Sequence, residues 1–357
     1  MALLKKLFFS VLIASGLSAN GFAADVLHLY NWNNYLAPET VKRFESSCKC
    51  KLVQDYYSDN EEMLAKLAAG AKGYDVIVPT GYAITTLLRQ NALQPLNKAK
   101  LPNFKNLNPG FLGTEFDKQN QYSVPYAYTI TLVGYNEQKI KSLNLNPNSW
   151  SILFDPATLQ KIKGRVTVLD SPRELVAAAL KYLGYSANST NAAELAKAKE
   201  VILKAKPYWA AFNGSSYIKE LTLGNIWVAH GYSNDMYQAQ QDALKAKRPF
   251  TISFTTQKEG NTLSVDSMVI HKSAPRPDLA LKFINFILEP QSSAELANLA
   301  GSGSPNIGAE KFVHADVKKN KAIFPDKAQL AKFEQLRDFD AKNRRALNKL
   351  WTDIKVK

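Results

Sequence analysis

The sequence is poor in the residues that most often build metal centres, since its 357 residues include only two cysteines and four histidines. The cysteines, Cys48 and Cys50, form a single C-x-C pair, whereas a structural zinc site needs four ligands. The histidines show no H-E-x-x-H or other ligand spacing; they are His28, His230, His271 and His314. We therefore expect no metal and no cofactor. In an oxidising compartment the two cysteines form a very small disulfide ring or remain thiols, and in both cases we expect a local structural role.

Sequence motifs of catalysis are also scarce. No G-x-S-x-G elbow and no P-loop occur. Ser216 and Lys219 fit the S-x-x-K spacing of some exported acyl-transfer enzymes, but the K-T-G element that accompanies this spacing is absent. We therefore expect a protein that is not an enzyme.

Long hydrophobic runs are missing as well. The apolar stretch 7–17 is well short of the roughly 20 residues needed to span a bilayer, and no later stretch reaches that length. Lys5 and Lys6 precede this stretch, and small residues follow it up to Ala23. A basic start, a short apolar core and a small-x-small exit are typical of a secretory signal peptide. We expect residues 1–23 to be a cleaved signal, the mature protein to be periplasmic, and no lipid anchor, because no cysteine lies at the cut.

Acidic residues are outnumbered, with 31 Asp and Glu against 45 Lys and Arg, so the formal net charge is +14. Such a balance would suit an anionic partner such as nucleic acid or lipid headgroups. However, the lysines are scattered along helical segments such as 196–206, with acids between them. This pattern favours a solvated surface, and we expect no nucleic-acid partner.

Strand and helix patterns alternate along the chain, which is long enough for two domains. Proline and N-cap residues open the helices and glycines end several of them. Alternation of this kind indicates an α/β protein with two units, each a mixed, mostly parallel sheet flanked by helices. The expected strands are 26–30, 51–57, 75–79, 165–169, 225–229 and 262–270, and the better-defined helices are 83–90, 172–183, 235–246 and 278–288.

Aromatic and acidic side chains gather where these strands end. In open α/β sheets, ligands bind outside the carboxyl ends of the strands, which points to the loops 32–35, 80–82, 170–174 and 232–235. Ammonium groups are donors only and need carboxylates or carbonyls, while methylenes beside a charge pack well on aromatic faces. The mixture therefore predicts a cationic ligand with a methylene spine. The aromatic residues are Trp32, Tyr35, Tyr82 and Tyr232. The acidic residues are Asp170, Glu174, Asp235 and Asp266, and the small polar residues are Asn33, Asn34, Thr80 and Ser171.

An ordered set of short motifs resembles the periplasmic spermidine/putrescine-binding proteins of ABC transporters. The set runs over nearly the whole mature chain and comprises 29–35 (LYNWNNY), 74–79 (YDVIVP), 124–126 (VPY), 169–174 (LDSPRE), 258–260 (KEG), 265–267 (VDS) and 282–290 (KFINFILEP). The resemblance implies a two-lobed periplasmic binding protein fold of type II, with the ligand in the cleft between the lobes. It implies one lobe of 25–132 plus 268–310 and another of 133–267 plus 311–357. It also implies a small polyamine ligand and a membrane ABC permease as partners, and we expect a monomer.

The resemblance also assigns ligand contacts residue by residue. Asp266 matches the acid that grips an ammonium group, and Glu174 matches an amine-binding acid. Asp235 matches a carboxylate of the putrescine-type branch, Tyr232 a position that is usually Trp, and Ser215 a minor polar contact. The full candidate site is Trp32, Asn33, Tyr35, Thr80, Tyr82, Ser171, Glu174, Ser215, Tyr232, Asp235 and Asp266.

Four positions depart from the family pattern. Ser171 and Asn34 stand where family members carry an Asp, Ser264 where they carry Trp or Phe, and Ser302 where they carry Tyr. Fewer acids and fewer aromatic walls suggest a ligand with fewer charges, weaker binding, or a bulkier ligand. The alternative function is therefore a binding protein of the same fold for another solute, such as an amino acid, a quaternary amine or an anion.

Overall fold

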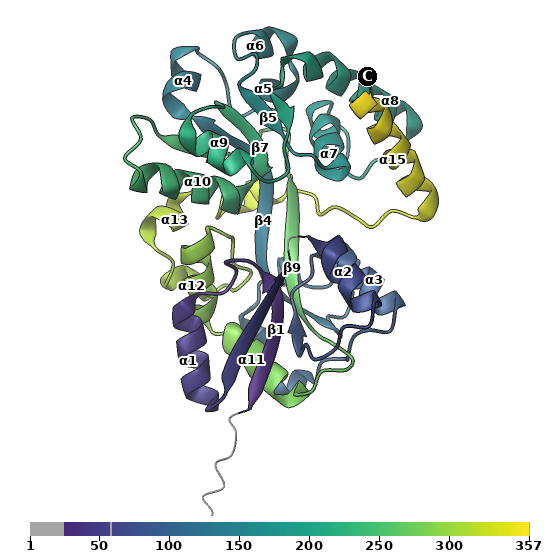
Figure 1. Ribbon diagram of the computed structural model, residues 1–357, viewed down its shortest axis with the longest axis vertical. Coiled ribbons are helices and arrows are strands. Elements are labelled where there is room, and N and C mark those ends of the chain that lie inside the picture. The colour runs from purple at the N-terminus through teal and green to yellow at the C-terminus, as the bar shows by residue number, and fades with distance from the viewer. Residues whose placement is uncertain (1–24, 58, 357) are drawn as a thin grey trace, which may run out of the picture.

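The chain folds into two lobes stacked along the long axis of the molecule (Figure 1). The computed structural model describes residues 25–57 and 59–356, so the signal peptide expected at 1–23 lies outside the described residues. Within the described ranges, no helix is both long and apolar enough to cross a membrane. The same residues contain no group of three or more His, Cys, Asp or Glu side chains arranged to hold a metal ion.

One continuous nine-stranded sheet joins the lobes, instead of a separate sheet in each unit. Its order is β2-β1-β3-β9-β4-β7-β5-β6, with β8 paired to β4. β1 pairs in parallel with β2 and β3, and β5 with β6 and β7, whereas β4 runs antiparallel to β7, β8 and β9. The strands are β1 Val26–Trp32, β2 Lys51–Tyr57, β3 Val76–Ile77, β4 Ser123–Asn136, β5 Val166–Val168, β6 Ala211–Phe212, β7 Val228–Tyr232, β8 Ile252–Thr255 and β9 Thr262–Ile270.

We call the region between the two lobes, where β4 and β9 pass from one lobe to the other, the waist (Figure 1). The half below the waist in Figure 1 is the lower lobe, and the other half is the upper lobe. The lower lobe contains β1–β3 with α1 Pro38–Cys48, α2 Asn60–Ala68, α3 Gly81–Arg89, α11 Pro277–Ile287 and α12 Pro290–Ala300. The upper lobe contains β5–β8 with α4 Glu137–Ser142, α5 Ser151–Phe154, α6 Pro156–Gln160, α7 Pro172–Tyr182, α8 Ala192–Ala205, α9 Tyr217–Leu223, α10 Ser233–Lys245 and α15 Ala341–Val356. The short helices α13 Ala315–Lys319 and α14 Lys327–Leu330 complete the list of α-helices in the described residues.

The long strands β4 and β9 cross the waist and belong to both lobes (Figure 1). β4 was missed in the sequence, because Pro125 lacks the N–H of a regular ladder and the strand shows no alternation. The structure accommodates Pro125 with a register shift between Pro125 and Ala127. Nearly all of β4 is buried, since helices or loops cover both faces of the sheet there.

Four apolar cores hold the lobes together internally. In the lower lobe, one core packs Phe44, Leu29 and Phe283 on one sheet face, and another packs Tyr30, Met63 and Leu87 on the other face. The two other cores divide in the same way around β5 and β7, and one of them extends across the waist, since it includes Ala294 and Ala297 of α12. The sheet in each lobe is therefore sandwiched between helices, as the alternating pattern predicts.

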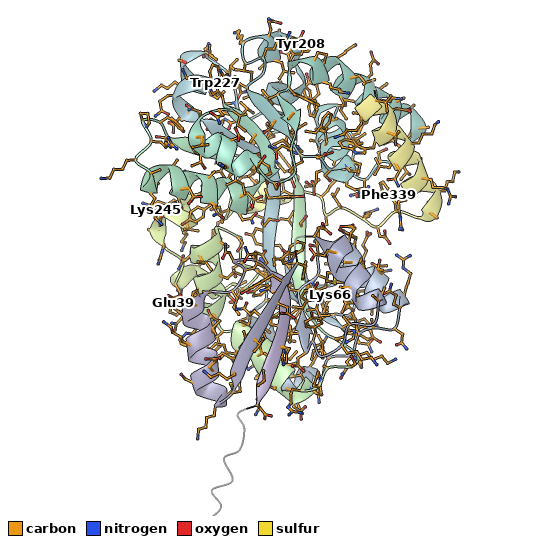
Figure 2. All side chains as sticks on the ribbon, in the orientation of Figure 1. Glu39, Lys66, Tyr208, Trp227, Lys245 and Phe339 are labelled. Carbon is orange, nitrogen blue, oxygen red and sulfur yellow. A yellow bond between two sulfur atoms is a disulfide. The ribbon has the colours of Figure 1, made fainter. Side chains whose placement is uncertain are left out.

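Some local expectations need correction. β1 continues to Trp32 and α3 begins at Gly81, so Trp32 and Tyr82 lie within regular elements and not on loops. Trp227, labelled in Figure 2, precedes β7 and is partly buried against an upper-lobe core, and the cationic groups of Lys139 and Arg165 lie over its ring.

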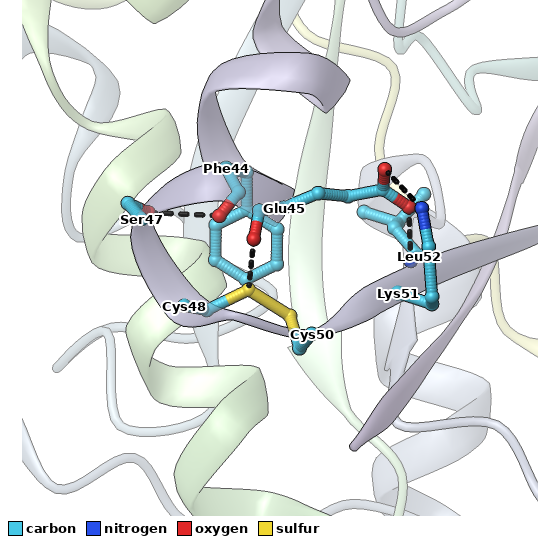
Figure 3. Close-up of a disulfide and its surroundings, with 7 residues drawn as sticks. All are labelled: Phe44, Glu45, Ser47, Cys48, Cys50, Lys51 and Leu52. Atoms are coloured by element: carbon cyan, nitrogen blue, oxygen red, sulfur yellow. Dashed lines mark hydrogen bonds and ion pairs between the residues drawn. A yellow bond between two sulfur atoms is a disulfide. The ribbon is translucent and has the colours of Figure 1, made fainter. Parts of the chain in front are cut away.

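Cys48 and Cys50 form a disulfide between the end of α1 and the start of β2 (Figure 3). Beside it, the Glu45 carboxylate accepts hydrogen bonds from the Leu52 backbone at 3.0 Å and from Lys51 at 3.2 Å. Lys49 between the cysteines adopts the left-handed conformation that ends the helix. The pair therefore has the local structural role expected of it, in the disulfide form.

Candidate functional site

Asp266 lies on β9, one of the two long strands that cross the waist, opposite Ala127 of β4. The side chain is only 7% exposed. Its Oδ2 accepts a hydrogen bond from the Tyr35 hydroxyl at 2.8 Å, and its Oδ1 accepts one from the Thr80 hydroxyl at 2.6 Å. Both donors are neutral, so they satisfy one lone pair on each oxygen without neutralising the negative charge.

The residues that hold Asp266 are themselves fixed by the lower lobe. Thr80 is the N-cap residue of α3 and forms an isolated antiparallel bridge with Asp266. Its backbone N–H donates to the side chain of the buried Asn60 at 3.2 Å. The Tyr35 carbonyl accepts the Tyr126 hydroxyl at 2.5 Å, which anchors the loop after β1. The hydroxyl cradle around Asp266 is thus held in place by contacts within the protein itself.

Asp235 is a second carboxylate, in the first turn of α10 in the upper lobe. The hydroxyl of the buried Tyr217 donates a hydrogen bond to its Oδ2. Gly231 makes this contact possible, because a Cβ at that position would lie 2.5 Å from the Tyr217 ring. Tyr217 was not expected as a site residue, since it lies in α9, away from the strand ends.

Glu174 is the third carboxylate and is 6% exposed. It lies in the first turn of α7, where Ser171 caps the helix by accepting the Glu174 N–H at 3.4 Å. The Thr262 hydroxyl on β9 donates to Glu174 Oε2 at 2.8 Å, and Thr131 on β4 is a further hydroxyl partner. Ser171 therefore positions Glu174 through the backbone.

Burial shapes the proton affinity of all three acids. Desolvation raises the pKa of Asp235 and of Asp266 to about 6, and the hydroxyl donors lower each pKa only in part. Desolvation also raises the pKa of Glu174, against the lowering effects of Thr262, Thr131 and the neighbouring Arg173. Buried carboxylates that face neutral donors are costly unless a cation compensates them, so the site favours a positively charged ligand.

Tyr232 lies among these groups at the end of β7. Burial raises the pKa of its phenol well above the usual range, and the negative charges of Glu174, Asp235 and Asp266 raise it further. Tyr82 from the lower lobe acts on the same phenol. The phenol of Tyr232 is therefore near enough to all three carboxylates to feel their charge, and its ring offers a surface on which methylenes next to an ammonium can pack.

A fixed aromatic wall lies on the lower-lobe side. The Trp32 indole N–H and the Tyr57 hydroxyl both donate to the Val78 carbonyl, at 2.9 and 2.5 Å. Their rings lie 4.6 Å apart. The Tyr82 hydroxyl accepts from Asn60 at 3.1 Å and donates to Glu61 at 3.0 Å. Tyr57, Asn60 and Thr262 were absent from the expected site, although Tyr57 ends the strand next to β1 and the strand-end rule applies to it as well.

Two expected contacts lie apart from the buried cluster. Asn33 is exposed, and Ser215 is exposed with its backbone N–H bonded to Asn213. Among the departures from the family pattern, Asn34 is exposed, and Ser264 pairs with Thr129 of β4. Ser302 is 1% exposed, and its hydroxyl has no hydrogen-bond partner in the described part of the chain.

The contacts of Ser216, the first residue of the S-x-x-K spacing, do not suggest an acyl-transfer site. An S-D-N triplet does occur at 58–60, but Asp59 caps α2 and Asn60 supports Thr80 and Tyr82. Ser216 accepts a hydrogen bond from Asn213 and lies exposed next to Tyr217.

The family model for bacterial extracellular solute-binding proteins matches residues 39–325. A Pseudomonas aeruginosa protein named putrescine/cadaverine-binding protein is 53% identical over 99% of this chain and 100% of its own length. The Escherichia coli putrescine-binding periplasmic protein PotF is 35% identical, with 99% of each chain covered. Among solved structures, the spermidine/putrescine substrate-binding protein PotD of Streptococcus pneumoniae superimposes with a TM-score of 0.84 at 27% identity, over 93% of this chain and 99% of that chain.

Proposed function

The chain belongs to the family of bacterial extracellular solute-binding proteins, and we propose that it is a periplasmic receptor that captures a polyamine and delivers it to an ABC permease. One observation carries the proposal. Three carboxylates, on Glu174, Asp235 and Asp266, are held by hydroxyl donors that leave their charge available, and the charges of all three act on the phenol of Tyr232. A linear polyamine supplies ammonium groups for these acids and methylenes for the rings of Trp32 and Tyr232.

We infer that the preferred ligand is a diamine of the putrescine or cadaverine type. The relative at 53% identity is named a putrescine/cadaverine-binding protein, and PotF is named a putrescine-binding protein. Ser171 supports the inference, because it supplies an uncharged helix cap where the spermidine-type resemblance has an acid. Two ammonium groups need two anionic positions, for which Asp266 and the pair of Asp235 and Glu174 on the upper-lobe side are available.

The mechanism we propose is closure of the two lobes on the ligand. The lobe boundaries are 25–132 plus 268–310 and 133–267 plus 311–357, so the chain crosses the waist in β4 and β9. A diamine that contacts Tyr82 and Thr80 from one lobe and Asp235 and Tyr232 from the other binds the closed state best, and therefore shifts the equilibrium towards it.

The remaining parts of the proposal follow from the same role. Residues 1–23 act as a cleaved signal that exports the chain. The mature protein is a monomer that binds no nucleic acid, and it acts by binding and release without catalysis. The permease recognises the closed receptor. Transport therefore starts only after the receptor has captured a ligand and closed.

Native mass spectrometry of purified protein, followed by calorimetric titration of stripped protein, tests the function. We expect one bound diamine, and an affinity order with putrescine and cadaverine ahead of spermidine and spermine. γ-Aminobutyrate, glycine betaine and phosphate serve as controls for the alternative solutes. An anion is disfavoured because Arg173, which precedes Glu174, already bonds Asn188 and the Arg337 carbonyl. Binding of a control solute, with no binding of the four polyamines at millimolar concentration, contradicts the proposal.

A further inference from the structure

A polar segment between α14 and α15 runs along the waist on the side of α2 and α3 (Figure 1). We call residues 333–339 the strap. It lies beyond residues 39–325, the part matched by the family model. Phe333, at the start of the strap, packs against the core that contains Met236 and Leu263. Phe339, at its end and labelled in Figure 2, packs against the core that contains Trp150 and Leu350.

Glu334 fixes the strap to the upper lobe and to β9. Its backbone N–H donates to the Asn261 carbonyl at 3.0 Å, and its carbonyl accepts the Leu263 N–H at 2.9 Å. Its carboxylate bonds Lys181 at 2.9 Å and also accepts hydrogen bonds from Ser186 and Ala187. The strap therefore moves as a part of the upper lobe.

Arg173 ties the far half of the strap to the ligand site. Its guanidinium donates to the Arg337 carbonyl at 3.0 Å and to Asn188 at 3.1 Å, and lies 3.7 Å from the centre of the Phe339 ring. Arg173 immediately precedes Glu174, one of the three carboxylates of the site. The position of the strap is thus coupled to the upper-lobe half of the site.

Two adjacent strap residues of opposite charge reach across to the lower lobe. Arg337 Nε lies 3.2 Å from Glu115 Oε2, and Asp338 pairs with Arg89. Glu115 precedes Phe116, and Arg89 ends α3; both Phe116 and α3 pack into a lower-lobe core. Each ion pair therefore has one partner on each lobe.

We propose that Arg337 and Asp338 form an electrostatic latch that stabilises the closed arrangement of the lobes and sets ligand affinity from outside the ligand site. The inference rests on the proposed function for the closure of the lobes and for the identity of the ligand whose affinity is measured. When only the closed state binds, the apparent affinity equals the intrinsic affinity multiplied by the fraction of protein that is closed. Residues that shift this fraction change affinity without touching the ligand.

The expected effect is moderate, because both pairs are exposed to solvent. The side chains of Arg337 and Glu115 are 67% and 43% exposed. Exposed pairs of this kind contribute little individually, so neutralising one should weaken binding about 2- to 5-fold, and reversing one charge about 3- to 10-fold.

The test is a charge-reversal cycle on the Arg337–Glu115 pair, since Asp338 also contacts Arg344 on its own side of the waist. The variants are Arg337→Glu, Glu115→Arg and the double exchange. The strap contacts described above use the backbone of Arg337, so its side chain can change without releasing the strap. The matched control is Arg276→Glu, because Arg276 and Asp25 form a similarly exposed pair at 3.0 Å within the lower lobe.

Two readouts are needed: the Kd for putrescine by calorimetry, and the radius of gyration of the ligand-free protein by small-angle scattering. We expect each single reversal to weaken binding 3- to 10-fold and to expand the ligand-free protein, because a reversal removes an attraction of at most about 5-fold and adds a repulsion between like charges. The double exchange should restore both quantities to within about 2-fold of the wild type, and Arg276→Glu should change neither. Unchanged Kd and size in the single variants, or no restoration in the double variant, overturns the latch. If the wild type binds no polyamine, the proposed function fails, while the scattering comparison still decides the latch.

Discussion

Replacing Asp266 by Asn should change stability and binding in opposite directions. The change removes a buried negative charge and keeps the size of the side chain. A charge-assisted hydrogen bond to an ammonium contributes roughly 1.5–3 kcal/mol, so the variant should bind putrescine about 10- to 150-fold more weakly. Loss of the long-range attraction adds to this effect in the same direction.

The stability change follows from the pKa. Burial raises the pKa of Asp266 from the ordinary 3.8 to about 6, so the folded ligand-free protein holds this proton more tightly than the unfolded chain does. Such a group destabilises the folded protein above pH 6, and the penalty disappears as the pH falls towards 4. A shift of about two units corresponds to at most about 3 kcal/mol at neutral pH. The ligand-free Asp266→Asn variant should therefore unfold at a higher temperature than the wild type at pH 7.5, and the gap should shrink at pH 5.

Thermal unfolding without ligand, paired with calorimetry, measures both effects. Asp278→Asn is the control, because Asp278 is an exposed carboxylate that Lys100 stabilises in its charged form. That control should leave affinity unchanged and should not raise the unfolding temperature. A lower unfolding temperature for Asp266→Asn together with unchanged affinity would refute the reasoning, since it would show a carboxylate that serves the fold and not the ligand.

Three further predictions concern the rest of the site. Ser264→Trp should tighten polyamine binding if the ligand follows the groove implied by the resemblance, because the new aromatic face contributes about 0.5–2 kcal/mol. Titrations with putrescine and spermidine measure this change, and weaker binding would indicate a wider ligand in that space. Tyr217→Phe removes the hydroxyl that lowers the pKa of Asp235, so its loss of affinity should be larger at pH 6 than at pH 8, and a loss independent of pH would indicate a packing defect alone. Wild-type affinity for putrescine should fall as the pH drops from 7 to 5, because Asp235 and Asp266 take up protons near pH 6 that a bound ammonium must displace. Calorimetry that shows the same affinity over this pH range would contradict this prediction.

The strand-end rule located much of the candidate site from the sequence. It selected Thr80, Glu174, Tyr232 and Asp235 because parallel strands and their following helices share one edge of a sheet. Asp266 was already among the acids counted with these loops, and the resemblance added its role as the acid that grips an ammonium group, although it lies within β9 and not at a strand end. These residues are the ones that the structure brings together at the waist.

Site residues that meet only through tertiary packing could not be predicted from the sequence. Tyr217 touches Asp235 because Gly231 leaves room for its ring, and no local pattern encodes that contact. The strap has neither helical nor strand periodicity, so nothing in its sequence shows that Arg337 meets Glu115 across the waist. The continuous sheet was also hidden, since Pro125 disguises the strand that joins the two lobes.

A crystal structure of the protein with putrescine bound is the most direct test of the central claim. We predict a diamine at the waist, with one ammonium nitrogen about 2.7–2.9 Å from an Asp266 carboxylate oxygen and the other facing Asp235 or Glu174. The methylenes should lie against Trp32 or Tyr232. A ligand bound elsewhere, or a ligand at the waist with Asp266 contacting only Tyr35 and Thr80, would contradict the account.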